Sequence, residues 1–200
     1  ELPPGREPIE TKLVAADGRQ AMEIHIDELI DQGQQVFVVC PLIDQSDSLG
    51  LKSVQAEFAR LSNGAFAHRR LEVLHGKLKA AEKAHIMGEF VAGRIDILIA
   101  TTVIEVGVDI PNASIMVIES AERFGLAALH QLRGRVGRGA NKSYCYLMSE
   151  SDSPTTLKRL RAMERTQDGF RLSQIDLEMR GPGEIYGARQ HGVLDLRMAN

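Results

Sequence analysis

Apolar and polar positions change between two periodicities along this chain, and the change predicts strands interleaved with helices. Wholly apolar runs such as QVFVVC (35–40) are typical of strands that a sheet buries on both faces. Together with shorter mixed runs, they predict strands at IETKLVA (9–15), QVFVVC (35–40), RRLEVLH (69–75), DILIATT (96–102), SIMVIE (114–119) and SYCYLMS (143–149).

Helical spacing of apolar residues fills the intervals between these strands. Met22, Ile26 and Leu29 recur at helical spacing until Gly33 ends the segment, and further helices are expected over 52–61 and 81–93. Strands that alternate with such helices indicate right-handed βαβ units, so we expect an α/β fold with a mainly parallel sheet and helices on both faces. The loops expected at its carboxyl edge, where ligands of such folds collect, are 40–42, 75–77, 101–109 and 119–125.

The pattern changes after about residue 150. Ser153 can cap a helix that has Pro154 at its first position, and a second helix should stop before Gly181 and Pro182. We expect a helical hairpin followed by an extended, glycine-rich loop. The predicted organisation is a linker from an upstream domain (1–10), an α/β domain (11–150), and the hairpin with its loop (151–200).

Composition narrows the class of protein. With 200 residues and 44% hydrophobic residues, the chain can form one α/β domain with an appendage. Its apolar runs are much shorter than a membrane span, and ELPPGREP at its start lacks the apolar centre of a signal peptide. Cys40 and Cys145 have no metal-ligand spacing around them, so we expect buried thiols, no metal site, and a soluble protein of the cytoplasm.

Charge is uneven although the net charge is only −3. The segment QLRGRVGR (131–138) concentrates arginines between glycines. On a continuous helix Gln131, Arg135 and Arg138 would share one narrow face, and Arg133 would point the opposite way. Planar, permanently charged guanidinium groups suit a site where charge develops on a phosphoryl group, but a solvated basic helix end would have the same pattern.

A second polar segment, TTVIEVGVDIP (101–111), makes the solvated alternative less favourable. It places two hydroxyl groups and two acids directly after an apolar strand, where a simple connection needs none of them. These residues are Thr101, Thr102, Glu105 and Asp109, with Gly107 between the acids. Asp109 alone would also be explained as a turn residue before Pro111.

These segments resemble known helicase motifs. TTVIEVGVDIP and QLRGRVGR, preceded by LHGKL (74–78), are similar to motifs V and VI in the second RecA-like domain of superfamily-two helicases. The stretches AERFGLAALHQLRGRVGRG (121–139) and DGFRLSQIDLEMRGPGEIYGARQHG (168–192) resemble the RecG family. Members of that family are ATP-dependent DNA translocases that remodel stalled replication forks and Holliday junctions in recombination and repair. The last stretch resembles their TRG element, which the transcription-repair coupling factor Mfd shares.

The resemblance implies a role for each candidate residue. Arg135, Arg138 and Gln131 match motif VI, whose arginines reach the γ-phosphate of ATP held by a first domain. Gly107, Asp109 and Glu105 belong to the motif V loop on the nucleotide side. DNA contacts are implied for Thr101, Thr102, His75, Gly76 and Lys77, although His75 would also serve as a simple strand cap. Arg159, Arg180 and Gln190 are implied to couple ATP hydrolysis to DNA movement, whereas lone arginines on such helices are usually surface charges.

No GxxxxGK[ST] phosphate loop and no DExH-type acid pair occurs in the sequence. We therefore expect that the ATP cradle and the Mg²⁺ ligands lie in an upstream RecA-like domain, and that this fragment alone is inactive. The resemblance also implies a monomer that acts on branched DNA, a wedge domain, and single-stranded-DNA-binding protein as a partner. Two alternatives stay open: the same region of Mfd, and a non-enzymatic RecA-like interaction domain.

Overall fold

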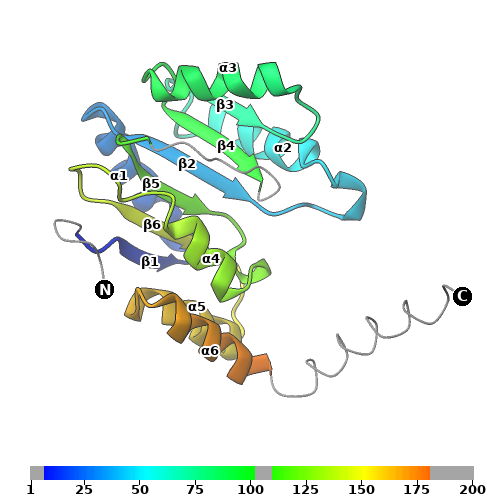
Figure 1. Ribbon diagram of the computed structural model, residues 1–200, viewed down its shortest axis with the longest axis vertical. Coiled ribbons are helices and arrows are strands. Elements are labelled where there is room, and N and C mark those ends of the chain that lie inside the picture. The colour runs from blue at the N-terminus through cyan, green and yellow to red at the C-terminus, as the bar shows by residue number, and fades with distance from the viewer. Residues whose placement is uncertain (1–6, 102–109, 181–200) are drawn as a thin grey trace, which may run out of the picture.

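The fold is a single parallel sheet with helices on both faces (Figure 1). The computed structural model describes residues 7–101 and 110–180. Its six strands have the order β1-β6-β5-β2-β4-β3, and every neighbouring pair is parallel. The strands are β1 (Glu10–Val14), β2 (Gln35–Cys40), β3 (Leu71–Leu74), β4 (Ile97–Thr101), β5 (Ala113–Ile118) and β6 (Tyr144–Met148). The predicted α/β fold class is confirmed.

Within the described ranges, six α-helices pack on this sheet in two layers. They are α1 (Arg19–Asp31), α2 (Leu51–Ser62), α3 (Ala80–Val91), α4 (Leu126–Arg133), α5 (Pro154–Arg165) and α6 (Gly169–Arg180). One core lies between the sheet and α1 and α2, and it contains Ile26, Val54 and Leu61. The other core covers the opposite face with α3 to α6, and it contains Phe90, Leu129 and Leu160.

The complete burial of the central strands explains why wholly apolar runs predicted them. Every residue of β2, β4 and β5 is buried, because helices cover both faces at these positions. Predicted strand and helix ends differ from the observed ones by at most two residues, with two exceptions: the first helix already begins at Arg19, and the helix expected through Arg138 ends at Arg133.

The predicted hairpin is present as α5 and α6. Ser153 Oγ accepts a hydrogen bond from the Thr156 amide at 3.5 Å, and Pro154 occupies the first turn of α5. Figure 1 shows the hairpin beside β1, at the end of the sheet opposite to α3. The proposed boundaries at residues 10 and 150 stay predictions.

Candidate functional site

The carboxyl edge of the sheet brings together three of the predicted loops. β3 ends at Leu74 and β4 ends at Thr101, so His75 and Thr101 leave neighbouring strands on the same side. The loop after β2 lies against them: the Gly76 amide donates to the Leu49 carbonyl at 2.7 Å, and Gly50 lies on the Thr101 side chain. His75–Lys77, Thr101 and the segment before α2 therefore form one cluster.

Thr101 is placed differently from what a DNA contact requires. Its side chain is 2% exposed, and its hydroxyl has no hydrogen-bond partner among the described residues. Gly50 covers it, so a phosphate could reach Thr101 only if the loop over it moved. Thr102, Glu105, Gly107 and Asp109 lie outside the described residues.

His75 and Lys77 are better placed for a phosphate backbone. Lys77 is exposed and His75 is half-buried, and the Lys77 amide donates to His75 Nδ1 at 3.2 Å. Burial, together with Lys77 and Lys83, lowers the pKa of His75 below its usual value. The imidazole is therefore neutral near pH 7, and Lys77 supplies the charge of this loop.

The arginine segment does not continue the helix, which corrects the expectation of one helical face. α4 ends at Arg133, and Arg135 and Arg138 follow it in irregular structure. The physical reason is the glycine content, because glycine is a poor helix former and Gly137 adopts φ +84°. Gln131, Arg135 and Arg138 are nevertheless all exposed, whereas Arg133 is buried.

Glycine contacts place this segment at the amino edge of the sheet. Gly137 packs against Ile9, just before β1, and Gly139 packs against the Pro111 carbonyl, just before β5. Because parallel strands start at a common edge, the arginine segment and the His75–Lys77 loop lie at opposite edges of the sheet. Pro111 also ends the motif V-like segment, so the two helicase-like segments meet here.

Of the three predicted coupling residues, Arg159 is the one whose contacts the structure describes. The Arg159 guanidinium donates to the carbonyl oxygens of Phe124 (2.7 Å) and Glu122 (2.8 Å), so it fixes α5 to the segment after β5. Arg180 is the last residue of α6, and Gln190 lies outside the described residues. The predicted link from Arg159 to the glycine-rich loop stays a prediction.

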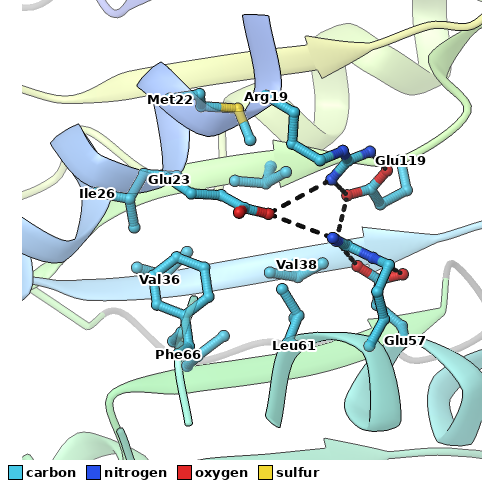
Figure 2. A pocket seen from close by; sticks show the side chains of 13 residues that line it. Arg19, Met22, Glu23, Ile26, Val36, Val38, Glu57, Leu61, Phe66 and Glu119 are labelled. Atoms are coloured by element: carbon cyan, nitrogen blue, oxygen red, sulfur yellow. Dashed lines mark hydrogen bonds and ion pairs between the residues drawn. The ribbon is translucent and has the colours of Figure 1, made fainter. Parts of the chain in front are cut away.

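An ion-pair network at the carboxyl end of β5 was not predicted. Glu119 accepts two hydrogen bonds from Arg19, both at 2.7 Å, and a third from Arg60 at 3.2 Å. Figure 2 shows Glu23, Glu57 and Glu119 converging on the two guanidinium groups from α1, α2 and the end of β5. Local helix spacing accounts for the pairs Arg19–Glu23 and Glu57–Arg60, but it does not indicate that both pairs meet at Glu119.

The donor chemistry of the described residues fits half of a nucleotide site. Exposed Arg135 and Arg138 can bind phosphate oxygens. In contrast, residues 7–101 and 110–180 contain no group of three His, Cys, Asp or Glu side chains that could hold a metal ion. Within the same ranges, no helix has the length and apolar character needed to cross a membrane.

A parallel six-stranded α/β domain with exposed motif VI-like arginines at one edge belongs to the class of RecA-like motor domains. The chain matches the family described as "Helicase conserved C-terminal domain" over residues 20–140, and it belongs to that family. Solved structures below 25% identity support the fold alone, among them the C-terminal domain of yeast Dbp5 (17% identity, TM-score 0.54, covering 86% of this chain and 98% of that one).

Within this class, the chain is similar to RecG over its whole length. It is 47% identical to the "ATP-dependent DNA helicase RecG" of Synechocystis sp. and 45% identical to that of Thermotoga maritima. Both matches cover 100% of this chain but only 24% and 26% of the relative. A structure of RecG bound to a three-way DNA junction superposes with a TM-score of 0.76 at 44% identity, over 92% of this chain and 24% of that one. The chain thus spans about a quarter of these relatives.

Proposed function

We propose that this chain is the second motor half of an ATP-dependent double-stranded DNA translocase that remodels stalled forks and Holliday junctions. One observation carries the proposal: exposed Arg135 and Arg138 lie at the amino edge of a RecA-like sheet, and His75–Lys77 lies at its carboxyl edge. A nucleotide and a DNA backbone can therefore bind the same domain at separate places. Similarity to RecG along the whole chain, hairpin included, supports this assignment.

In this proposal Arg135 and Arg138 bind the phosphates of ATP and stabilise the negative charge that develops during transfer to water. Gln131 lies on the last turn of α4 and orients the same group, and Glu105, Gly107 and Asp109 are assigned to nucleotide binding. Mg²⁺, when bound, neutralises charge on the phosphate oxygens, and its ligands belong to a first RecA-like domain. Arginine groups of this kind contribute about 10³- to 10⁵-fold in rate.

DNA binding in this proposal uses the phosphate backbone rather than base edges. Lys77 contacts phosphates beside His75 and Gly76, whose amide is bonded to the Leu49 carbonyl, and Thr101 and Thr102 join Lys77 if the covering loop moves. Arg159, Arg180 and Gln190 couple hydrolysis to DNA movement through the hairpin. We further propose a monomer that acts in the cytoplasm on branched DNA, with a wedge domain, and with single-stranded-DNA-binding protein as a partner.

Neither alternative is favoured. Mfd shares motif VI and the hairpin, but the relatives from Synechocystis sp., Acidithiobacillus ferridurans and Thermotoga maritima, which match across the whole chain, are RecG helicases. A non-enzymatic interaction domain would not explain why Gln131, Arg135 and Arg138 are all exposed around a glycine-rich turn.

The test is ATP hydrolysis by the full-length protein with and without a branched DNA. We expect strong stimulation by the DNA, and Lys77→Ala should raise the DNA concentration needed for half-maximal stimulation without lowering the maximal rate. Lys158→Ala, which removes an exposed lysine of α5, is the matched control and should change neither value. The absence of DNA-stimulated hydrolysis in the unmodified protein would contradict the proposed function.

A further inference from the structure

Arg133 is a buried cation whose hydrogen-bond partners, in the part of the chain that the structure describes, include no carboxylate. Its side chain is 1% exposed, and its Nη1 donates to the Met163 carbonyl at 2.7 Å and to Thr11 Oγ1 at 3.2 Å. Its Nη2 donates to the Thr166 carbonyl at 3.0 Å. Both carbonyls end α5, where the helix dipole favours a cation. A buried charge of this kind is retained at a cost, which suggests a function for its position.

His130, one turn earlier on α4, also takes part in the contact between the end of α4 and the hairpin. Arg133 Nη2 also donates to His130 Nδ1 at 3.1 Å. Because arginine is only a donor, Nδ1 must accept, so the imidazole is neutral and carries its proton on Nε2. A Cβ atom at Gly169 would lie 2.7 Å from the His130 ring, so the first residue of α6 rests directly on it. The end of α4 thereby fixes both helices of the hairpin.

The hairpin connects the two edges of the sheet. Arg133 holds the end of α5 at the amino edge, and Gln167 Nε2 donates to the Ile9 carbonyl at 3.1 Å beside it. Midway along α5, Arg159 holds the helix to the carbonyl oxygens of Glu122 and Phe124, in the segment that follows β5 at the carboxyl edge. Arg133 is also two residues from Arg135. A displacement of the arginine segment therefore has a rigid, hydrogen-bonded route to the carboxyl edge.

We propose that Arg133, through its hydrogen bonds to His130, Met163 and Thr166, is the positioning residue that transmits movement of the Arg135–Arg138 segment to the α5–α6 hairpin. This inference rests on the proposed function. It assigns Arg133 a role in coupling and none in contact with nucleotide or DNA.

The experiment measures, in the full-length protein, the number of base pairs unwound on a branched DNA per ATP hydrolysed. Arg133→Lys keeps the charge, but a single nitrogen cannot span the four partners, so the ratio should fall about fivefold or more while the hydrolysis rate changes less. Arg161→Lys, at an exposed position of α5, is the matched control and should leave both rates unchanged.

A second pair of variants separates coupling from folding. His130→Leu removes the acceptor and should lower the ratio, whereas His130→Asn places an oxygen near the position of Nδ1 and should restore it. Loss of hydrolysis and unwinding in equal proportion in a folded Arg133→Lys or His130→Leu protein would overturn the inference, and so would an unchanged ratio in both. If Arg133→Lys does not fold, the His130 pair decides alone. Failure of the proposed function is recognised separately, because the unmodified protein would then lack DNA-stimulated hydrolysis.

Discussion

A Cβ atom added to Gly50 would lie 2.5 Å from Cγ2 and 2.7 Å from Oγ1 of Thr101. Gly50 also adopts φ +75°, a region that residues with a side chain rarely occupy. The loop after β2 can therefore cover the end of β4 closely only because this position is a glycine.

Gly50→Ala should destabilise the protein by about 2 kcal/mol or more, since it adds a collision to the backbone strain. Gly33→Ala is the matched control, because Gly33 has φ +86° but nothing within 4 Å of the added atom. The control should cost only about 1 kcal/mol. Urea unfolding measures both, and equal losses would show that the Thr101 contact is unimportant.

Arg135→Ala or Arg138→Ala should lower ATP hydrolysis by the full-length protein at least about a hundredfold, because charge on the transferred group is left uncompensated. Affinity for a junction should change little. Arg133→Ala should lower hydrolysis much less, since Arg133 is buried away from solvent. Steady-state rates and junction-binding titrations on the same preparations test this, and a larger effect of Arg133 on hydrolysis would contradict it.

The isolated 200-residue chain should neither hydrolyse ATP nor bind it tightly, because its sequence has no phosphate loop. Isothermal titration with ATP and Mg²⁺, together with a phosphate-release assay, checks both statements. Magnesium-dependent turnover by the pure chain would show that the nucleotide site is complete without a first domain.

Glu119→Gln should destabilise the protein by about 2 kcal/mol, because it weakens three charge-assisted hydrogen bonds around a carboxylate whose side chain is 11% exposed. Glu89→Gln is the matched control, since Glu89 forms the same two-point pair with Arg94 on the surface of α3. The control should change the unfolding free energy little. Similar losses in both variants would show that burial does not strengthen the network.

Stability should decrease in mild acid through His130. Burial, reinforced by Arg133, lowers the pKa of His130 below 6.5, although Asp168 opposes this. The folded protein then binds fewer protons than the unfolded one, so its stability is complete above about pH 6.5 and is lost as the pH falls toward the lowered pKa. His130→Asn should lack this component. Urea unfolding of both proteins between pH 5 and pH 8 is the measurement, and identical pH profiles would contradict the assignment.

Local patterns were sufficient to predict the strands and helices. These patterns are local: the apolar runs form β2, β4 and β5, and Ser153 and Pro154 begin α5. Each signal lies within a few neighbouring residues, so it can be recognised in a single sequence. The end of α4 was harder to predict. The spacing of Gln131, Arg135 and Arg138 is compatible with a helix, but three glycines after Arg133 end the helix at Arg133.

Contacts between distant segments could not be predicted. The burial of Arg133 depends on carbonyls 30 and 33 residues away and on Thr11, 122 residues away. The pair Arg19–Glu119 joins residues 100 positions apart. Such partners depend on strand order, and a single sequence specifies parallel pairing without specifying which strands are neighbours.

The position of β1 has a consequence for biosynthesis. β1 is an edge strand, and its hydrogen-bonded neighbour β6 comes about 130 residues later, which at roughly 5–20 residues per second leaves β1 waiting for many seconds as the chain leaves the ribosome. During that interval the exposed backbone groups of ETKLV could pair with another nascent chain. Lys12 in the middle of the strand, and Glu10 at its start, place charges on this segment that disfavour such pairing until β6 and α5 have been made.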